Sequence, residues 1–483
     1  MIRPTLLAVG LFAHLSAAET LFVPSQYTTV QEAVSASSPN DVIEIASGHQ
    51  EFPSRPIELN HHVTIRGQSD TSRVQFWSPD TEFSKIFGGT DLEVTCQNLE
   101  FRNYHSGVGD VKVGTFLNCS FLDHGNDRSC FNVECGDNIV VRNSRFINCE
   151  RGNGAGVLEV DQGSESCGQN NYASVLFDNC DFTNCSSFTN GSGSGGAIGI
   201  KGKSVSLDIQ NCHFDTCHSN GSGGAISIYE AVEGDVTIAN CEFSNCTSFL
   251  AGGAIYCRGL TLQLSESVFR NNSSVSTEIQ FGGGAAWIYA SPSVITGCDF
   301  YNNATGSIGG GIHYFGPDFN QGTVGLDITA CHFEQNTAAI AGGLAGGAHV
   351  SYSTFCENSQ PALSPQTITG EEVLFSACGS CCIGSSCISV DESNCISAGG
   401  TYVDADCSVN ACPSPEGSCC LSSSCVTANI NTCFELGGSF AGFGTNCSDT
   451  QCTFACEGDV SGNGTVDFTD LLILINNWGN CPG

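Results

Sequence analysis

The chain has 483 residues, of which 31 are cysteine, and its formal net charge is −34 with only 15 lysine and arginine residues. Nucleic acid and anionic membranes are not expected as partners of so acidic a chain, and acidic polysaccharides are disfavoured, whereas a neutral, cationic or metal-bridged partner fits. Such a charge is also typical of the solvated surface of a secreted protein, and the length is sufficient for two to four domains.

Residues 1–18 have the features of a secretory signal peptide. Arg3 supplies the positive charge, LLAVGLFAHL is a short apolar run, and SAA before Glu19 offers small residues for cleavage. No later stretch is apolar over the length that a transmembrane helix needs, so no transmembrane segment is expected. The cysteine content agrees with an oxidising compartment. These features predict a secreted protein, extracellular or at the cell surface.

A short motif centred on phenylalanine recurs along the first three quarters of the chain, as in NCDFTN, NCHFDT and NCEFSN. Successive copies are 20 to 36 residues apart, which indicates stacked units joined by loops of variable length. Ten phenylalanines occupy this position: Phe101, Phe121, Phe146, Phe182, Phe214, Phe243, Phe269, Phe300, Phe333 and Phe355.

An alternating strand precedes each of these phenylalanines, as in DVTIANCEF. If the strand has a kink near Asn240, the alternation places four side chains on one face. These are Val236, Ile238, Phe243 and either Cys241 or its neighbour. One such strand cannot bury its face alone, whereas stacked copies about 4.8 Å apart bury a continuous column. Recurring glycine patches such as GGAI would form the tight corners. The pattern predicts a parallel β-helix.

Two resemblances agree with this fold. The GGAI and FxxN signatures (FRNN, FYNN, FEQN, FCEN) are similar to the repeats of chlamydial polymorphic outer-membrane proteins. The segment VPSQYTTVQEAVSASSPNDVIEIASGHQEFPSRPIELNHHVTIRGQS resembles the N-terminal cap and first coil of the pectin-lyase-like superfamily. The resemblance implies an all-β, right-handed parallel β-helix over 19–376, with a capping helix in TTVQEAVSA and first strands in DVIEIASG and HVTIRG. This superfamily includes enzymes, adhesins and inert stalks, so the fold does not assign a function.

Sixteen cysteines fall within the predicted β-helix. They recur two residues before and three residues after the repeat phenylalanine, as in Cys180 and Cys185, Cys212 and Cys217, and Cys241 and Cys246. Asparagine takes the later position in three further copies, at Asn272, Asn303 and Asn336. A position that accepts cysteine or asparagine indicates a stacked ladder at a turn. Disulfides within or between rungs and a metal site are the alternatives.

Two cysteine-rich modules follow, at 377–414 and 415–454. CCIGSSCISVDESNCISAGGTYVDADCSVNAC and CCLSSSCVTANINTCFELGGSFAGFGTNCSDTQC share the pattern CC-x4-C-x7-C followed by C-x4-C. Modules this small bury little core, so we expect three disulfides in each, closed within the module, with zinc as the alternative. They are similar to cysteine-rich repeats near the ends of secreted bacterial proteins.

A calcium-binding loop is predicted within the last segment, 455–483. DVSGNGTVDFTD places oxygen ligands at alternate positions and Gly464 at the sharp turn, with LLILINNW as the exiting helix. The expected Ca²⁺ ligands are Asp459, Ser461, Asn463, Thr465, Asp467 and Asp470. The segment resembles a dockerin repeat. Dockerins that bind cohesins carry two copies, whereas this chain has one, which disfavours a cohesin partner.

The residues that precede the repeat phenylalanines should face outward from the β-helix: Arg145, Asp181, His213, Glu242, Val268, Asp299 and His332. Stacking would bring Asp181, His213 and Glu242 onto consecutive rungs, with the two carboxylates roughly 10 Å apart. That separation approaches the one used by inverting glycosidases. Outward polar residues are equally a feature of any solvated solenoid, and the sequence has no clear lyase or hydrolase signature.

The sequence therefore favours a secreted, non-catalytic β-helix that acts in surface adhesion or carbohydrate binding and has a calcium-binding tail. The alternative is a polysaccharide-degrading enzyme, a lyase or glycoside hydrolase of the pectin-lyase-like fold, with Asp181, His213 and Glu242 as the catalytic candidates. The expected partner is an extracellular polysaccharide or a cell-surface component. Aromatic residues near the glycine patches would form a sugar-stacking face or pack in the core or turns: Tyr229, Tyr256, Trp287, Tyr289 and Tyr314.

Overall fold

The computed structural model divides the chain into two compact units, Met1–Phe375 and Ser376–Gly483. In the first unit it describes residues 18–375, except 54, 71–72, 78–84, 90–91, 105–106, 110, 126–128, 135, 153, 162–172, 189–193, 202–204, 230–233, 290–291, 317–324, 360 and 365–366. In the second unit it describes 379–383, 386–390, 396, 401–403, 417–421, 424–428, 433, 436, 439–443 and 445–448. The predicted signal peptide, except for Ala18, and the predicted calcium loop lie outside the described residues.

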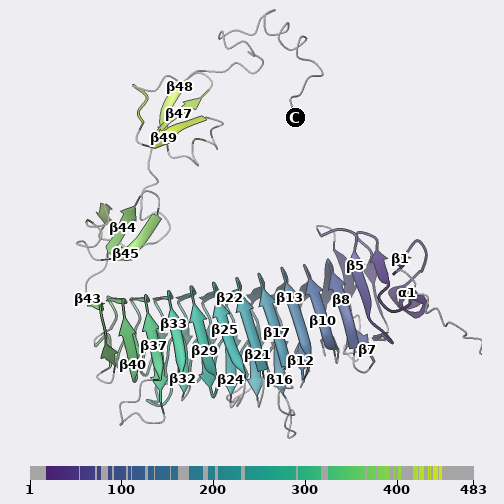
Figure 1. The fold of residues 1–483 in the computed structure, drawn as a ribbon, viewed down its shortest axis with the longest axis horizontal. Coiled ribbons are helices and arrows are strands. Elements are labelled where there is room, and N and C mark those ends of the chain that lie inside the picture. Colours follow the sequence, from purple (N-terminus) through teal and green to yellow (C-terminus); the bar gives the residue numbers. More distant parts are fainter. Residues whose placement is uncertain are drawn as a thin grey trace, which may run out of the picture. The chain divides into compact units, whose positions relative to one another are not determined.

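The first unit is an all-β, parallel β-helix, which confirms the predicted right-handed fold (Figure 1). Two long sheets run along it. Sheet A has 14 strands: β1 (Thr20–Val23), β2 (Val42–Ile45), β5 (Val63–Gly67), β8 (Leu92–Gln97), β10 (Val111–Leu117), β13 (Asn138–Arg142), β17 (Ala173–Asp178), β21 (Val205–Gln210), β25 (Asp235–Ala239), β29 (Thr261–Ser265), β33 (Ser293–Thr296), β37 (Leu326–Thr329), β40 (Ala348–Ser351) and β42 (Ile368–Thr369). Sheet B has 13 strands and contains the repeat phenylalanines: β3 (Gln50–Glu51), β6 (Val74–Trp77), β9 (Leu99–Arg102), β11 (Ser120–Leu122), β14 (Arg145–Ile147), β18 (Asp181–Thr183), β22 (His213–Asp215), β26 (Glu242–Ser244), β30 (Val268–Arg270), β34 (Asp299–Tyr301), β38 (His332–Glu334), β41 (Thr354–Cys356) and β43 (Leu374–Phe375).

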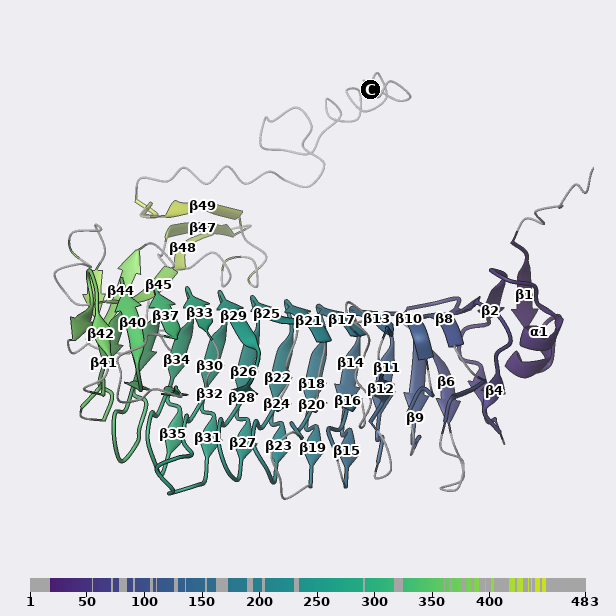
Figure 2. The same ribbon diagram turned by 60° about the horizontal axis from the view of Figure 1, so that its bottom comes forward.

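Three shorter sheets complete the β-helix. Sheet C has two strands, β4 (Ile57–Glu58) and β7 (Phe87–Gly88). Sheet D has eight strands, most of which follow a glycine patch: β12 (Phe131–Val133), β16 (Leu158–Asp161), β20 (Ile198–Lys201), β24 (Ile226–Tyr229), β28 (Ile255–Arg258), β32 (Ala286–Tyr289), β36 (Ile312–Phe315) and β39 (Leu344–Ala345). Sheet E consists of six two-residue strands, visible as one row in Figure 2: β15 (Glu150–Arg151), β19 (Ser186–Ser187), β23 (His218–Ser219), β27 (Thr247–Ser248), β31 (Ser273–Ser274) and β35 (Ala304–Thr305).

One coil illustrates how the sequence turns its corners. Between β25 and β26 the chain bends at Asn240, and between β26 and β27 it bends at Asn245, with φ values of 52° and 55°. Asparagine tolerates this left-handed region better than most residues, so the kink predicted near Asn240 is confirmed. Glycine is required at the corner before β28, because a Cβ on Gly253 would lie 1.9 Å from the carbonyl oxygen of Gly284.

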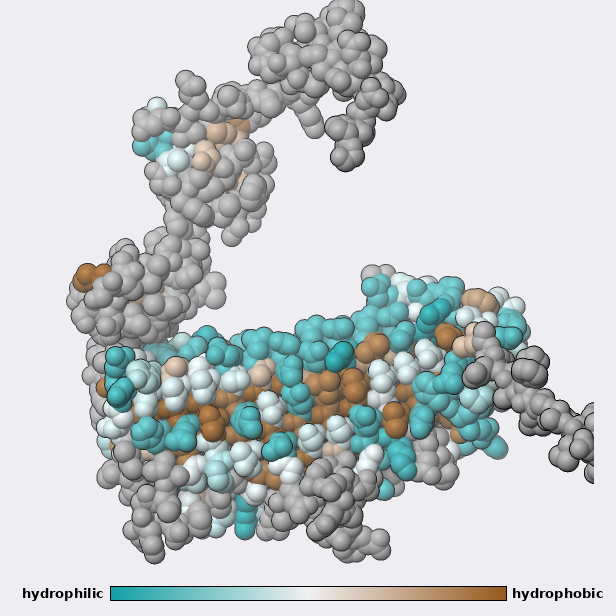
Figure 3. All heavy atoms as spheres, viewed as in Figure 1, coloured by the Kyte–Doolittle hydropathy of each residue, from teal (hydrophilic) through white to brown (hydrophobic). Residues whose placement is uncertain are grey.

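The core is a column of stacked phenylalanine rings. From Phe182 to Phe355, neighbouring rings lie 4.3–4.8 Å apart between centroids and within 8° of parallel. In-register parallel pairing, such as Phe214 with Phe243, stacks each ring on the next. Hydrophilic side chains and an apolar band share the surface of the β-helix that Figure 3 shows.

The cysteines of the β-helix form ladders of buried free thiols, as the recurring positions predict. Thirteen described cysteines of this unit are free and buried: Cys96, Cys119, Cys130, Cys149, Cys180, Cys185, Cys212, Cys217, Cys241, Cys246, Cys257, Cys298 and Cys331. Cys356, in the last coils, is instead disulfide-bonded. Among the residues that the structure describes, no group of three or more His, Cys, Asp or Glu side chains is placed to hold a metal ion.

Asparagine continues the second cysteine ladder with hydrogen bonds. Asn272 Nδ2 donates to Asn303 Oδ1 at 3.0 Å, and Asn303 Nδ2 donates to Asn336 Oδ1 at 2.9 Å. Asn336 Nδ2 continues the series to Asn358 Oδ1 at 2.9 Å. Each amide also bonds to the backbone of a neighbouring coil, for example Asn303 Nδ2 to the Phe269 carbonyl at 3.0 Å. These bonds satisfy polar groups that would otherwise be buried without partners.

The N-terminal coils begin with the predicted capping helix. Helix α1 (Val30–Ala36) contacts β1, β2 and β4 and buries Val30, Ala33 and Val34. Its N-cap is Thr29, whose side chain accepts a hydrogen bond from the Glu32 backbone amide. The predicted strands in DVIEIASG and HVTIRG are β2 and β5, and β1 precedes both in the same sheet. No described helix is both long enough and apolar enough to cross a membrane.

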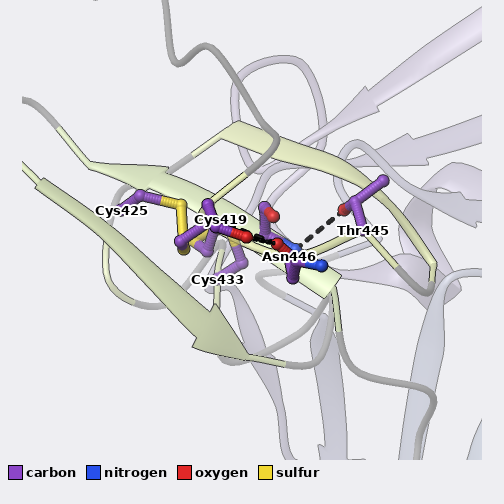
Figure 4. The surroundings of a disulfide bond; sticks show 8 residues. Cys419, Cys425, Cys433, Thr445 and Asn446 are labelled. Atoms are coloured by element: carbon purple, nitrogen blue, oxygen red, sulfur yellow. Dashed lines mark hydrogen bonds between the residues drawn. A yellow bond between two sulfur atoms is a disulfide. The ribbon is translucent and has the colours of Figure 1, made fainter.

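The second unit contains two small antiparallel sheets of three strands each. The strands of the first are β44 (Gly379–Ile383), β45 (Ser386–Val390) and β46 (Thr401–Val403), and those of the second are β47 (Gly417–Leu421), β48 (Ser424–Ala428) and β49 (Ser439–Phe443). Two disulfides, Cys419–Cys433 and Cys425–Cys447, both lie within the predicted module 415–454 (Figure 4). Cys381 and Cys420 are also disulfide-bonded. These bridges confirm disulfides as the basis of the modules, whereas the module boundaries stay predictions.

Candidate functional site

The outer face of sheet B presents one continuous column of side chains, here called the outer column. It consists of the residue before each repeat phenylalanine and its register partners on earlier strands, and each member pairs directly with the next. In order they are Gln50, Gln75, Glu100, Ser120, Arg145, Asp181, His213, Glu242, Val268, Asp299, His332 and Thr354. All seven stripe residues predicted from the sequence belong to this column. Its alternation with the buried phenylalanines explains why most members are polar.

The catalytic candidates Asp181, His213 and Glu242 occupy consecutive strands in the middle of the outer column, as expected. Ser244, on the same strand as Glu242, lies beside His213: its Oγ donates to Asp215 Oδ1 at 2.7 Å and is 3.3 Å from His213 Nε2. A hydrolytic triad needs histidine between the serine and the carboxylate. Here Ser244 contacts the carboxylate of Asp215 directly. Ser244, His213 and Asp215 therefore do not form a catalytic triad.

Asp215 is held in its ionised form by its surroundings. Burial alone would raise the pKa of Asp215, but hydrogen bonds from Ser244 and Asn245 and the charge of His213 lower it overall. Asn245 Nδ2 donates to Asp215 Oδ1 at 2.9 Å. Asp215 is therefore a fixed anion on this face, and a fixed anion serves better as a binding or orienting group than as a proton donor.

Farther along sheet B, a second group of charged residues surrounds Asp299. Burial raises the pKa of Asp299, and the charges of His332 and Arg270 oppose that rise. Arg270 Nε lies 3.9 Å from Glu242 Oε1, and the Arg270 guanidinium lies 4.3 Å from the centre of the Tyr301 ring. Arg270 thus lies between an exposed carboxylate, Glu242, and a half-buried carboxyl, Asp299. The two acidic side chains have different environments on one face.

His332 is fixed in place at the end of this group. Its Nε2 atom lies 3.0 Å from Glu334 Oε2, and its Nδ1 atom contacts Thr354 Oγ1. The Tyr301 ring lies beside it, with 5.4 Å between ring centroids. Glu334 is almost completely buried. The imidazole is therefore oriented on both ring nitrogens, with little freedom to rotate.

A pocket of about 560 Å³ lies at the other end of the outer column. Its lining is polar apart from the backbone of Gly48, and the side chains are Gln50, Asp70, Arg73, Gln75, Glu100 and Arg145. The volume falls in the range typical of small-ligand sites, but the lining is far more polar than is usual for apolar ligands. Amide, carboxylate and guanidinium groups on a shallow concave surface suit a ligand rich in hydroxyl or charged groups.

Glu100 organises this pocket. Its carboxylate accepts hydrogen bonds from Gln75 Nε2 at 2.9 Å and from Arg102 Nε at 2.7 Å, and it lies 3.6 Å from Arg145 Nη2. Glu100 is only 5% exposed, and a carboxylate this buried needs several such partners. Gln50 Nε2 extends the network by donating to Gln75 Oε1 at 3.0 Å. The pocket is therefore a pre-formed network of hydrogen bonds.

The aromatic residues near the glycine patches pack against one another on sheet D or within the core. Tyr256 and Trp287 are stacked with centroids 4.6 Å apart and are nearly buried, and Trp287 Nε1 donates to the Gln280 carbonyl at 3.1 Å. Tyr314 belongs to the main core, and Arg258 lies between the half-buried rings of Tyr229 and Tyr289. Because these ring faces contact each other or Arg258, core and turn packing describes them better than a sugar-stacking face.

No protein-family model matches the chain, and no curated protein matches it significantly. Among solved structures, the chain is similar to the catalytic unit of a thermostable GH87 α-1,3-glucanase from Streptomyces thermodiastaticus strain HF3-3. The identity is 10% and the TM-score 0.42, and the match covers 72% of this chain and 64% of the glucanase chain. A PL6 alginate lyase in complex with a trisaccharide matches at 10% identity and a TM-score of 0.32, over 77% of this chain and 91% of the lyase. Tailspike protein 3 of bacteriophage CBA120 matches at 13% identity and a TM-score of 0.31, over 71% of this chain and 57% of the tailspike chain. The chain thus spans less than two thirds of the glucanase and the tailspike protein, and similarity at this level carries no functional information.

Sequence reasoning identified the middle of the outer column but not the pocket. Asp70 and Arg73 lie outside the repeat motif, in the segment before β6, and their position beside Glu100 depends on how that loop folds. Glu100 itself was recognisable, because NLEFRN is one of the repeat copies. The predicted calcium ligands lie outside the described residues, and the resemblances to polymorphic outer-membrane proteins and dockerins stay predictions.

Proposed function

We propose that the protein is a secreted glycan-binding β-helix that holds a polysaccharide along the outer face of sheet B. The observation that supports this most is the polar pocket of about 560 Å³, since four of its lining residues, Gln50, Gln75, Glu100 and Arg145, belong to the outer column. The pocket opens onto a row of polar side chains that a long ligand can follow. Side-chain amides and carboxylates fixed by hydrogen bonds are well suited to sugar hydroxyl groups.

Binding to a linear polymer agrees with the regularity of the outer column. Consecutive rungs of a parallel sheet repeat about every 4.8 Å, so the column offers polar groups at even spacing along the β-helix axis. An extended polymer meets such a surface at several points at once, and weak contacts then add up. Calcium at the C-terminal loop and secretion through the N-terminal signal peptide belong to the same proposal.

The full-length protein tests this proposal directly. Soluble neutral and acidic polysaccharides would be titrated into the protein while affinity is measured by calorimetry and by retardation in affinity gels. We expect retention of at least one glycan and weaker retention by Gln75→Ala. Asn220→Ala is the matched control, because Asn220 follows β23 in sheet E, away from the outer column. Absence of binding to every glycan, or equal binding by both variants, would overturn the proposal.

A second function, hydrolysis of the bound glycan, is supported by the pair Glu242 and Asp299. Val268 separates them in the outer column, so they lie two rungs apart, about 10 Å between backbone positions. Inverting glycosidases place two carboxyl groups about 6.5–9.5 Å apart, with a water molecule between base and sugar. The half-buried Asp299, whose pKa is raised, would protonate the leaving oxygen, and the exposed Glu242, near Arg270, would activate the water.

Release of new reducing ends separates hydrolysis from simple binding. If Glu242 and Asp299 are the acid–base pair, Asp299→Asn and Glu242→Gln each abolish release and leave glycan binding intact, whereas Asp181→Asn retains release. If Asp181→Asn abolishes release and Asp299→Asn does not, the pair predicted from the sequence, Asp181 and Glu242, is the catalytic one. Retention without any release leaves the protein as a binding module.

A further inference from the structure

The positive charges of this chain are concentrated near its N-terminus. Eleven of the 15 lysine and arginine residues lie within residues 1–151, and none follows Arg270. The same range contains 18 aspartate and glutamate residues, so its net charge is −7 and most of the overall charge of −34 belongs to the rest of the chain. Local charge, more than net charge, decides which ligand a pocket accepts, since exposed charges beyond about 8–10 Å are largely screened at physiological salt.

Two arginines of this region converge on a single neutral acceptor in the polar pocket. Arg145 Nε donates to Ser120 Oγ at 2.8 Å, and Arg73 Nη1 donates to the same oxygen. Arg73 Nη2 donates to Asn118 Oδ1 at 2.6 Å. Ser120 lies between Glu100 and Arg145 in the outer column, at the centre of the first coils. Both guanidinium groups line the same pocket.

The two guanidinium groups repel each other in this arrangement. Burial lowers the pKa of Arg73, and the charge of Arg145 lowers it further. The Glu100 carboxylate offsets part of this repulsion, but it is shared with Arg102 and Gln75 as well as Arg145. Asp70 contributes a second negative charge at the pocket. The pocket lining therefore holds two arginines and two carboxylates and is formally neutral, within a chain whose net charge is −34.

We propose that Arg73 and Arg145 bind the carboxylate or sulfate group of an acidic glycan in this pocket. The inference rests on the proposed glycan-binding function of the same face and specifies the class of ligand. Guanidinium groups present paired N–H donors that match the oxygens of such anions. An anion between the two arginines also relieves their repulsion, and the amides of Gln50 and Gln75 remain within the same pocket for neighbouring hydroxyl groups. A formally neutral pocket with two guanidinium groups thus opposes the expectation, drawn from net charge, that acidic polysaccharides are disfavoured.

Matched pairs of polysaccharides test the proposal on the full-length protein. Dextran is compared with dextran sulfate and carboxymethyl-dextran, and hydroxyethylcellulose is compared with carboxymethylcellulose, each by calorimetry at 50 and 300 mM NaCl. We expect the charged member of a pair to bind about tenfold tighter than the neutral one, with the difference reduced at high salt. The carboxymethyl and sulfate derivatives distinguish the two anionic groups.

The variants Arg73→Gln and Arg145→Gln should each lower the affinity for the charged glycan by more than the affinity for its neutral counterpart, so that the ratio of the two affinities falls. Arg142→Gln is the matched control, since Arg142 lies on sheet A and faces Asp178, with Nε–Oδ2 at 3.6 Å. Thermal unfolding verifies that each variant is folded. Equal affinity for charged and neutral glycans overturns this inference while glycan binding itself stands, and no binding to any glycan overturns both.

Discussion

The ring of Phe243 is stacked on the ring of Phe214, with centroids 4.7 Å apart and planes 3° from parallel. The two residues are register partners in neighbouring parallel strands, β22 and β26. Parallel rings at this centroid distance agree with the offset stacking that aromatic pairs prefer, and the backbone register repeats the arrangement from strand to strand. Each ring supports those above and below it, which makes the core of this β-helix a one-dimensional stack.

Phe243→Ala should reduce the free energy of unfolding by about 3–5 kcal/mol, because it removes a completely buried ring whose neighbours are fixed by the sheet. Urea denaturation monitored by circular dichroism measures the change. Phe249→Ala is the control from the same coil, since Phe249 is 59% exposed. Loss of similar stability in both variants would mean that the phenylalanine column does not dominate the core.

The buried asparagine ladder provides a second test of stability. Asn303→Leu removes the acceptor of the Asn272 backbone amide and the side-chain donor to the Phe269 carbonyl, at a cost of about 1–3 kcal/mol for each group left unsatisfied. Asn302→Gly is the control, because Asn302 has a φ of 52°, where glycine is at least as well accommodated. Chemical denaturation compares the two variants. A cost for Asn303→Leu no larger than for Asn302→Gly would refute the role of the ladder.

The fold was predictable because the same local pattern recurs in many copies of the repeat, and every copy indicates the same strand and the same corners. Alternation before Phe243 indicated a strand, Asn240 indicated the kink, and the glycine patch indicated a corner that a side chain would block. The sequence did not reveal that a two-residue strand, β27, lies between Asn245 and that glycine patch. Thr247 and Ser248 are too short a run to show periodicity. Long repeated patterns are informative, whereas two-residue strands are not.

The thiols of the β-helix should be unreactive in the folded protein. Burial raises the pKa of Cys119 and of Cys257 to about 12, so very little thiolate is present at neutral pH. We expect Ellman's reagent to detect none of the 13 buried free thiols in the native state and to detect them after unfolding in guanidinium chloride. Rapid labelling of the folded protein would show that these positions are open to solvent, contrary to the ladder.

Asp299 should make the folded protein less stable as pH rises. Because burial raises the pKa of Asp299 in the folded state, the folded state binds more protons than the unfolded state between the ordinary aspartate pKa, about 3.9, and the raised value. Stability therefore decreases across that window and stays lower above it. Asp299→Asn should raise the melting temperature at pH 7 and lose this advantage near pH 3, as measured by calorimetry.

Asp181→Asn is the matched control for this pH dependence, since Asp181 occupies the same column and is exposed. A melting temperature of Asp299→Asn that equals the wild type at pH 7 would mean that Asp299 is not desolvated in the fold. The candidate acid could not be recognised from the sequence. Asp299 was predicted to be one of several outward residues, but its pKa depends on its partial burial and on the charges of Arg270 and His332, which lie on the two neighbouring strands.

The C-terminal loop remains the place where residue identity fixes the chemistry most directly. Position 12 of the predicted loop is Asp470, which is shorter than the glutamate that usually binds calcium with both oxygens. We therefore expect moderate affinity, with a dissociation constant near or somewhat below the 10⁻⁴–10⁻³ M typical of extracellular modules. Binding should order the adjacent LLILINNW segment, since so short a helix is marginal in water by itself.

Calcium titration of the full-length protein by calorimetry measures the affinity, and the helical signal in circular dichroism measures the ordering of the helix. Asp459→Ala should abolish them and Asp449→Ala, which lies outside the loop, should not. A wild type that does not respond to calcium, or an Asp459→Ala variant that responds normally, would reduce the motif to a coincidence of sequence.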